Sequence, residues 1–494
     1  MILRWISQTH TWLGLIVCLF FAMWFATGLV MHYVPYPSLT SNEYFAALHN
    51  IKFEKIRVDP DTTNTVFSKK PPDRIRLVMR LTRPQYIIEW SDHIVARYAD
   101  GGSIAAKVSA DEALLLTKDY AENSGFIDFN ASYEYQQDYD QWTVAGGLDK
   151  HRPLHKIALN DEEKTELYIS SVTGELVRDT SAFERRWNYL GSVLHWIYPT
   201  VLRKYPALWD SLVWWLSAIA IIAALAGVIL GLARIGKKKN RFSPFKGMYF
   251  WHHILGLFTA VFVMTYIFSG WLSMDHGLIF STGQPTLSQR KAVSGELDIG
   301  SFKNVSSLKN NSAIKNNSAI KKNAVKELEF ISINDKHFVR FRYGAGSQSL
   351  MDFQQKVKPQ FSPDDFAHIT QANRLIQHYT CDHIIPIAAQ DAYPNSSDTH
   401  GLVVYRVICN DPAQTWVHID SANGRIIQIL DESRRWYRWL YEGLHTLNFP
   451  FLLDRPLVRE ALVIFFCVFG FLFSVTGIYL AYRRLMGFPA KPNR

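Results

Sequence analysis

The sequence predicts a membrane protein with four transmembrane α-helices and two α+β soluble domains, arranged as a tandem internal duplication. Three observations carry this fold class: four long apolar stretches, basic residues gathered beside them, and an internal repeat that includes one gap-free stretch. The chain has 494 residues, of which 48% are hydrophobic and 20% charged. This composition is too apolar for a disordered chain, and the length allows several domains.

Four stretches are long enough to cross a bilayer, which takes about 20 apolar residues. The first differs from a cleaved signal peptide because its apolar region is too long and the "MHYVPYP" after it offers no small-residue cleavage site. We therefore expect a retained anchor. The four expected spans cover roughly Trp12–Tyr33, Leu212–Ala233, Ile254–Met274 and Ala461–Tyr482.

The net charge of +9 is concentrated beside the apolar stretches. Arg234–Lys246, "RIGKKKNRFSPFK", is rich in basic residues and has no acid, the C-terminal "YRRLMGFPAKPNR" is similar, and Arg4 lies near the N-terminus. Basic clusters next to apolar helices report membrane orientation and disfavour a nucleic-acid partner. We expect a multi-pass protein of the bacterial inner membrane, with both termini cytoplasmic and the two large soluble segments in the periplasm.

The spans divide the chain into alternating membrane and soluble parts. The soluble parts mix alternating strands, such as Arg74–Leu81 and His337–Tyr343, with Ser-capped helices, such as Ser109–Ala121 and Ser362–Tyr379. This mixture favours small α+β modules over a nucleotide-binding fold. In chain order we expect helix 1 (1–33), a periplasmic domain (34–207), helix 2 (208–234), a basic cytoplasmic loop (235–249), helix 3 (250–275), a second periplasmic domain (276–457, with a low-complexity insertion at 303–324), helix 4 (458–483) and a cytoplasmic tail (484–494).

The two halves of the chain match each other without gaps over a long stretch. With His195 placed on His445, Pro206 meets Pro456, Gly227 meets Gly477 and Arg234 meets Arg484. Upstream, "LYISSVTGELV" overlies "WVHIDSANGRII", and at the head of each unit "HTWLGL" overlies "HHILGL". Such a repeat predicts two units related by a pseudo-two-fold axis along the membrane normal.

Histidines gather at both ends of the spans, and none lies in the middle of one. A single histidine near a membrane surface is usually an ordinary interfacial residue, but here several recur at matching positions. Imidazole supplies an axial nitrogen to haem iron, and glycine lets a flat macrocycle or a second helix approach the backbone. The expected cytoplasmic histidines are His10, His252 and His253, and the expected periplasmic ones are His32, His195, His276 and His445.

The first span places its histidines and glycines on one stripe. At about 100° per residue, His10 and Gly28 point in the same direction, with Gly14 and His32 about 40° away. The third span repeats the stripe with His252, Gly256 and Gly270. These glycines are candidate cofactor contacts, although helix packing explains them equally well.

Two redox centres fit this pattern better than one. His10 and His32 are about 33 Å apart along a helix, so one haem cannot use both. Two-fold symmetry pairs His10 with His252 as ligands of one haem iron and His195 with His445 as ligands of a second. His32 and His276 remain alternatives for the outer centre, and His253 competes with His252.

The four cysteines and the absence of common catalytic and nucleotide-binding motifs limit the reactions that the chain is expected to perform. Cys381 and Cys409 share one soluble segment, where an oxidising compartment permits a disulfide, whereas Cys18 and Cys467 lie in spans and are expected to pack. No GxGxxG, Walker, HExxH or GxSxG motif stands in a workable context.

The block "YISSVTGELV…ERRWNYLGSVLHWIYPT", together with "HTWLGL" at the head of the first span, resembles the PepSY-associated transmembrane-helix family. Members of this group include inner-membrane ferrisiderophore reductases with four spans, intertwined periplasmic domains and two b-type haems. The resemblance implies PepSY-like soluble domains, two haems b and electron delivery to a periplasmic ferric chelate. The chain departs from the group in its longer soluble segments and its Asn-rich insertion.

We therefore expect a transmembrane dihaem ferric (siderophore) reductase that works in iron acquisition. Its partners would be membrane lipid, a ferric siderophore or other periplasmic electron acceptor, and a quinol or separate reductase as donor, because the short cytoplasmic segments have no room for a nicotinamide or flavin domain. The alternative is a non-enzymatic PepSY membrane protein that binds a periplasmic ligand or partner, with the histidines as interfacial anchors. A permease is disfavoured because the span cores carry no charge.

Overall fold

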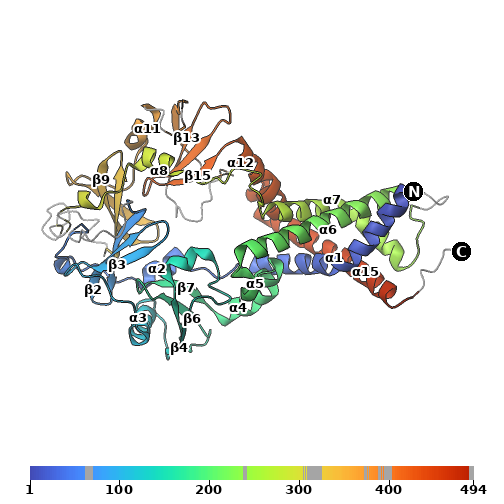
Figure 1. Ribbon diagram of the computed structural model, residues 1–494, viewed down its shortest axis with the longest axis horizontal. Coiled ribbons are helices and arrows are strands. Elements are labelled where there is room, and N and C mark those ends of the chain that lie inside the picture. The colour runs from blue at the N-terminus through green and yellow to red at the C-terminus, as the bar shows by residue number, and fades with distance from the viewer. Residues whose placement is uncertain are drawn as a thin grey trace. The chain divides into compact units, whose positions relative to one another are not determined.

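The structure is a computed structural model that consists of two compact units (Figure 1). The helical unit comprises Met1–Tyr36, Phe183–Thr282 and Ser433–Arg494, and the β-rich unit comprises Pro37–Ala182 and Gly283–Glu432. The residues described are 1–61, 71–236, 242–303, 305, 308, 325–371, 375–376, 378–387, 391, 393 and 403–488.

Four long helices build the helical unit, and each is long and apolar enough to cross a membrane. They confirm the four spans expected from the sequence. α6 and α15 both begin with proline in the first turn, where its missing N–H leaves no hydrogen bond unmade. The helices are α1 (Ile2–Tyr33), α6 (Pro206–Arg234), α7 (Met248–Leu272) and α15 (Pro456–Leu485).

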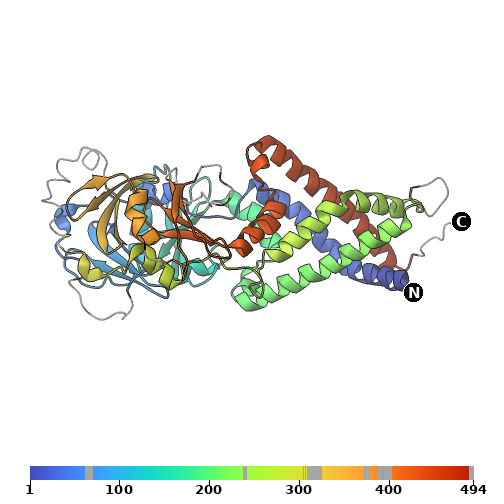
Figure 2. The ribbon, with the colours of Figure 1, turned by 90° about the horizontal axis from the view of Figure 1, so that it is seen from above.

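Each of these helices packs against two others, so that α1 and α7 both lie between α6 and α15. Figure 2 shows the four crossing in one bundle, with the N-terminal end of α1 and the C-terminal end of α15 at the same end. We call this the terminal end and the opposite one the connecting end. Phe21, Phe25 and Phe262 fill the interior with small residues between them. A Cβ on Gly470 would lie 2.5 Å from the Phe25 ring, so only glycine fits there.

Two connecting segments complete the helical unit. α4 (Ala182–Asn188) continues into the π-helix η3 (Tyr189–Val193), and α12 (Glu432–Tyr437) continues into the π-helix η8 (Arg438–Gly443). The expected domain limits at 207 and 457 therefore need revision, because residues from Phe183 and from Ser433 onward belong to the helical unit. Three short helices follow these segments: α5 (Thr200–Arg203), α13 (Leu444–Thr446) and α14 (Pro450–Leu453).

A seven-stranded antiparallel sheet lies at the centre of the β-rich unit. Its order is β11-β10-β9-β8-β1-β2-β3, and β1 of the first soluble segment pairs with β8 of the second through Ile75↔Phe330 and Leu77↔Leu328. The two segments therefore form one unit, where the sequence led us to expect two domains. The strands are β1 (Arg74–Arg80), β2 (Arg83–Glu89), β3 (Ile94–Tyr98), β8 (Glu327–Ile333), β9 (Lys336–Gly344), β10 (Ser347–Asp352) and β11 (Val357–Lys358).

Two four-stranded antiparallel sheets share one topology, with strands in sequence order. The turn after the third strand has glycine at positive φ in both, Gly174 at 75° and Gly424 at 70°. The strands are β4 (Ser132–Gln137), β5 (Leu154–Ala158), β6 (Glu166–Ser170) and β7 (Leu176–Thr180) in one sheet, and β12 (His383–Pro386), β13 (Val404–Ile408), β14 (Trp416–Asp420) and β15 (Ile426–Leu430) in the other.

Helices of the β-rich unit are short. α3 (Ala110–Asn123) packs on β5 and β6, and Ser109 accepts a hydrogen bond at its N-terminus. The helix expected over Ser362–Tyr379 is described as η6 (Pro363–Phe366) and α11 (Ala367–Gln371). Residues 372–374 and 377, and most of the expected 303–324 insertion, lie outside the described residues. The remaining helices are α2 (Ser41–Ala47), η1 (Phe53–Lys55), η2 (Gly146–His151), α8 (Leu287–Ser294) and η4 (Ile299–Ser301).

A buried ionic network crosses the central sheet where the two segments meet. Arg76 on β1 donates to Glu175 at 2.6 Å and to Glu327 on β8 at 3.1 Å. Glu329 on β8 pairs with Arg74 on β1 at 2.8 Å. Burial alone would raise the pKa of Glu175, but Arg76 lowers it to about 2. These buried charges are paired where β1 meets β8, so removing one partner would leave the other charge buried and unpaired.

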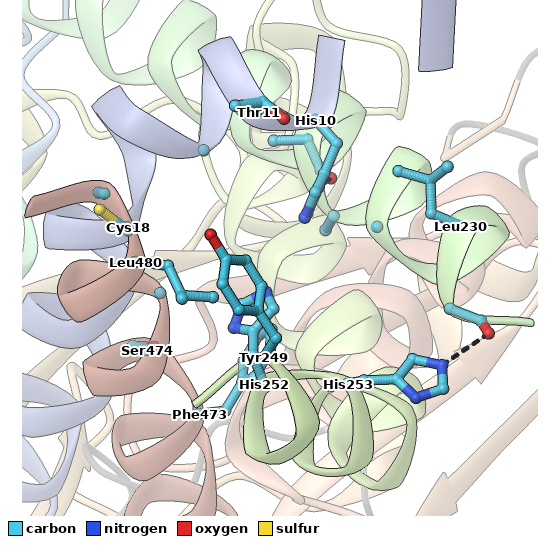
Figure 3. Close-up of a pocket in the computed structure, with 18 of the residues that line it drawn as sticks. His10, Thr11, Cys18, Leu230, Tyr249, His252, His253, Phe473, Ser474 and Leu480 are labelled. Carbon is cyan, nitrogen blue, oxygen red and sulfur yellow. Dashed lines mark hydrogen bonds between the residues drawn. The ribbon is translucent and has the colours of Figure 1, made fainter. Parts of the chain in front are cut away.

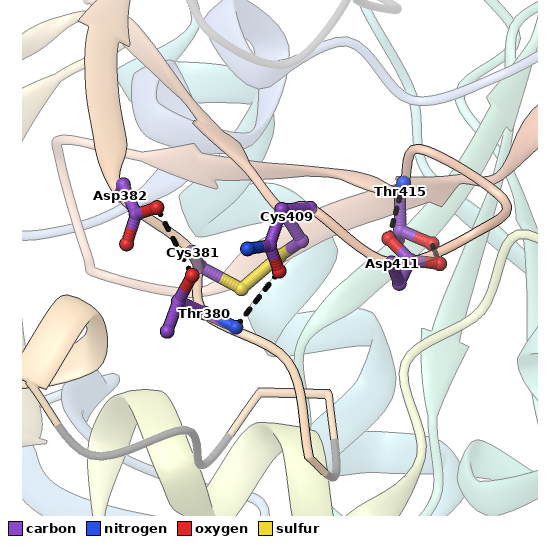
Figure 4. The surroundings of a disulfide bond; sticks show 7 residues. Thr380, Cys381, Asp382, Cys409, Asp411 and Thr415 are labelled. Atoms are coloured by element: carbon purple, nitrogen blue, oxygen red, sulfur yellow. Dashed lines mark hydrogen bonds between the residues drawn. A yellow bond between two sulfur atoms is a disulfide. The ribbon is translucent and has the colours of Figure 1, made fainter.

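One disulfide closes the first hairpin of the second small sheet (Figure 4). Cys381 precedes β12, Cys409 follows β13, and Thr380 donates its backbone N–H to the side chain of Asn410 at 3.0 Å beside the bond. The sequence permitted this pairing without fixing it. Cys18 and Cys467 are free and buried among the helices. The disulfide links the start of β12 to the end of β13, and it lowers the conformational entropy of the unfolded chain.

Candidate functional site

Four of the predicted histidines lie in two facing pairs within the helical unit. The rings of His10 on α1 and His252 on α7 have centroids 6.2 Å apart. The rings of His195 and His445, which follow the two π-helices, have centroids 6.1 Å apart. His10 lies near the terminal end of α1, whereas His195 contacts Gly28 on the same helix, roughly 27 Å further along its axis. One pair therefore lies toward each end of the bundle.

The terminal pair is held through the Nδ1 atom of each ring. His10 Nδ1 donates to the carbonyl oxygen of Ala223 on α6 at 2.9 Å. His252 Nδ1 lies 2.8 Å from the hydroxyl of Thr476 on α15, and that hydroxyl already donates to Phe473 O at 2.5 Å. Because the hydroxyl hydrogen is used, the oxygen accepts from Nδ1–H of His252. Both rings therefore carry the proton on Nδ1 and a lone pair on Nε2.

His195 and His445, the connecting pair, are also held by hydrogen bonds at Nδ1. His195 Nδ1 lies 2.9 Å from the Thr27 hydroxyl, which donates to Met23 O at 2.7 Å. His445 Nδ1 lies 3.1 Å from the Ser269 hydroxyl, which donates to Tyr266 O at 3.1 Å. All four histidines thus have the tautomer that leaves Nε2 free to bind a metal, with Nδ1–H bound by a second group that orients the ring.

A glycine of another helix lies beside each imidazole. A Cβ on Gly227 would come within 2.6 Å of His10 Cε1. The corresponding distances are 3.3 Å from Gly270 to His445, 3.4 Å from Gly28 to His195 and 3.6 Å from Gly477 to His252. The predicted glycines Gly28 and Gly270 therefore let an imidazole approach the helix. At Gly227 no side chain fits while His10 keeps its position.

π-helices immediately precede both histidines of the connecting pair. η3 ends two residues before His195, and η8 ends two residues before His445. A π-turn inserts an extra residue into a helix, is rare in proteins and is found frequently at functional sites. His195 is further fixed by its carbonyl oxygen, which accepts from Trp24 Nε1 at 3.0 Å. The same irregularity at both positions brings the two rings together.

A cavity of about 690 Å³ opens between the four long helices around the terminal pair (Figure 3). Figure 3 shows His10 and His252 on facing helices, with Cys18 and Leu480 in the apolar wall. The volume lies within the range of cofactor and ligand sites, about 300–1,000 Å³. Gly14 and Gly256 line the cavity as well; a Cβ on Gly14 would meet nothing within 4 Å, and one on Gly256 would lie 3.0 Å from Phe473.

The other three predicted histidines have different surroundings. His253 uses both nitrogens, Nε2 with Gly231 O and Nδ1 with the Ser243 hydroxyl, each at 2.9 Å, so it has no free lone pair (Figure 3). His276 binds the carboxylate of Asp210 through Nδ1. His32 stacks edge-on against Tyr33. In the described part of the chain, none of the three rings contacts a second histidine ring.

Sequence analysis did not single out several side chains that hold the rings. The hydroxyls of Thr27, Ser269 and Thr476 each stand directly before one of the glycines, in Thr-Gly or Ser-Gly pairs. Two arginines, Arg234 and Arg484, line the same cavity from the ends of α6 and α15. The internal alignment gave a signal for some of these residues, because it places Thr27 on Ser269 and Arg234 on Arg484, whereas Thr476 aligns with Ala226.

The chain was compared with known protein families and with curated proteins. The family described as the PepSY-associated TM region matches residues 7–352, more than half of the chain. The chain belongs to this family. The match runs from α1 through α6 and α7 into the central sheet and confirms the family expected from the quoted motifs. No curated protein is similar enough to this chain to count as a relative.

Proposed function

We propose that this PepSY-associated membrane protein is a dihaem reductase that passes electrons across the bilayer to a ferric chelate in the periplasm. The observation that carries the proposal is the two pairs of facing imidazoles, all protonated on Nδ1, one toward each end of the bundle. In the described residues no group of three or more His, Cys, Asp and Glu side chains is arranged around a bare metal ion. Two opposed imidazoles suit a metal whose other ligands come from a macrocycle.

The spacing of the rings suits two imidazoles that would share one iron. A transition metal binds an imidazole nitrogen at about 2 Å, so an ion shared by two facing rings separates their centroids by roughly 6 Å. The observed separations are 6.2 and 6.1 Å. The hydrogen bonds from Nδ1 make each ring a stronger donor through Nε2 and hold its plane. Haem b, when bound between such a pair, supplies one-electron redox chemistry.

The terminal cavity suits a cofactor with an apolar body and an anionic edge. Its walls are apolar and glycine-rich, and Arg234 and Arg484 line it at helix ends. Within the described residues no ion pair neutralises either arginine. Their guanidinium groups would bind carboxylates at that edge through charge-assisted hydrogen bonds. We assign His252 rather than His253 to this site because both nitrogens of His253 are already bonded.

The distribution of charge and the repeat support the proposed orientation and direction of transfer. The basic residues at the terminal end favour a cytoplasmic position for it, and the tandem duplication accounts for the matching histidine pairs. A membrane quinol or a separate reductase would supply electrons. At the connecting end one electron would convert chelated Fe(III) to Fe(II), which hard oxygen ligands hold less well. His32 and His276 then serve as interfacial side chains.

The test uses the full-length protein in lipid nanodiscs. A dithionite-reduced minus oxidised spectrum should show a Soret band and b-type α and β bands. Anaerobic addition of a ferric siderophore to the reduced protein should reoxidise the bands while an Fe(II) indicator reports one Fe(II) per electron lost. A protein with no Soret band would contradict the haem assignment. Bands that stay reduced would leave the haems in place and contradict the ferric-chelate substrate.

A further inference from the structure

The helical segment that leads into His195 exposes large apolar side chains along one face. Phe183, Trp187, Leu190 and Leu194 are 62%, 42%, 56% and 42% exposed. Their spacing of four, three and four residues places them in a single stripe along α4, η3 and Leu194, the residue that directly follows η3. An exposed apolar stripe on a helix marks an interaction surface, because water-facing helices place polar residues there.

The opposite face of the same segment is fixed to the end of α1. Asn188 is fully buried and donates from Nδ2 to Pro35 O at 2.9 Å. A Cβ on Gly191 would lie 3.0 Å from Val30 Cγ1. The segment therefore packs closely on the last turn of a membrane-spanning helix, and its apolar stripe is not the result of loose packing.

Attachment to the last turn of α1 sets the height of the stripe in the membrane. A span ends where hydrocarbon gives way to headgroups, so a segment packed on its last turn lies at that boundary. Val201 and Tyr205, 73% and 55% exposed, continue the apolar surface to the start of α6. Arg186 on the exposed side is placed to reach lipid phosphates.

We propose that α4 and η3 form an interfacial helix, with Phe183, Trp187, Leu190 and Leu194 embedded among the lipids at the connecting end of the bundle. Lipid is the occupant because the segment packs on the last turn of a membrane-spanning helix and has the composition of interfacial helices, aromatic and leucine side chains beside arginine. The proposal does not depend on the haem assignment.

The matching segment of the second half lacks this stripe. Positions 433 and 437, which align with 183 and 187, are a serine and a tyrosine that is only 6% exposed. Tyr437 packs on Phe280 and Tyr441, with ring centroids 5.4 Å apart in both cases. Of these two described segments, the first therefore offers the complete four-residue stripe to the bilayer, and it holds His195 at a depth set by lipid.

Site-directed spin labelling tests the depth. A nitroxide is attached at Leu190→Cys, and Leu440→Cys serves as the matched control. Both labelled proteins are placed in nanodiscs of phosphatidylethanolamine and phosphatidylglycerol. The native cysteines are buried or disulfide-bonded, so they leave little background. A Phe183→Cys label provides a second reading near the start of the stripe, and thermal unfolding of each labelled variant confirms that it is folded.

We expect the labels at 190 and 183 to collide more often with oxygen, which dissolves in lipid, than with a water-soluble nickel chelate. The label at 440 should show less contact with oxygen than the one at 190. A label at 190 that meets mainly the nickel chelate would place the stripe in water and overturn the proposal. A label at 190 shielded from both would show a protein partner or a second copy on the stripe, which overturns it equally.

Discussion

The two histidine pairs have the same ring separation but are held by different parts of the fold. His10 and His252 lie on long helices, and the helices enclose a cavity around them. His195 and His445 lie on connecting segments, just after π-helices, and reach the bundle through Gly28 and Gly270. The terminal site therefore depends on helix packing alone, whereas the connecting site also depends on how two irregular segments leave the bundle.

The largest expected effect distinguishes two glycines of the terminal site. Gly227→Ala places a methyl group 2.6 Å from His10 Cε1, which forces the ring aside, so we expect loss of one of two haems. Gly477→Ala is the matched control, since its methyl would lie 3.6 Å from His252, an ordinary contact. Alanine in place of a helical glycine normally stabilises by about 0.5–1 kcal/mol, so helix propensity cannot explain a loss. The measurement is haem per chain by pyridine haemochrome.

Equal haem content in the Gly227→Ala and Gly477→Ala variants would show that haem binding at the terminal site does not depend on the close approach of His10 to α6. The comparison between the two ends would then rest on the cavity alone.

A smaller effect is expected from the hydroxyl that orients His252. Thr476→Val keeps the shape of the side chain but removes the acceptor for Nδ1–H, so the ring becomes a weaker donor. The oxidised metal should be less stabilised, and the reduction potential of the terminal centre should rise while that of the connecting centre stays unchanged. Thr476→Ser restores the acceptor and should restore the potential. A potentiometric titration in which both centres move together would contradict independent sites.

The smallest effect concerns one matched position at which the two small sheets of the β-rich unit differ. His418 on β14 is fully buried, while Tyr168 occupies the same place on β6. Burial, together with Arg406, lowers the pKa of His418 from 6.5 to about 3. Between these values the unfolded chain binds a proton that the folded chain does not, so stability is present above pH 6.5 and is lost as pH falls toward 3, by on the order of a few kcal/mol.

Hydrogen exchange between pH 7 and 4.5, corrected for intrinsic rates, should therefore show β14 losing protection faster than β6. His418→Gln should reduce the difference, because glutamine does not titrate. Equal loss in both sheets would contradict an acid response specific to His418. Glu175 does not contribute in this range, because its folded-state pKa of about 2 means that its stabilisation is lost only below its ordinary value of 4.5.

The sequence was sufficient for features that depend on local composition. Apolar length identified the four spans, and motif order identified the family. It also singled out the four histidines that meet. The stripe grouped His10 with Gly28 on α1, but in the structure Gly28 lies beside His195 and His10 lies beside Gly227, toward opposite ends of the bundle.

The features that the sequence could not fix depend on distant neighbours. His252 and His253 differ by about 100° of helix rotation, and only the positions of Thr476, Gly231 and Ser243 decide which ring has a free nitrogen. The pairing of β1 with β8 joins strands some 250 residues apart in sequence, and alternation within a strand does not say which edge it meets.

The most direct test of the two-centre account is haem stoichiometry in single histidine variants. Wild-type protein should contain two haems b, and His10→Ala and His195→Ala should each contain one, with different residual reduction potentials because different centres remain. His32→Ala should retain both. A wild type with no haem, or a His10→Ala variant that keeps two, would contradict the assignment of one centre to each histidine pair.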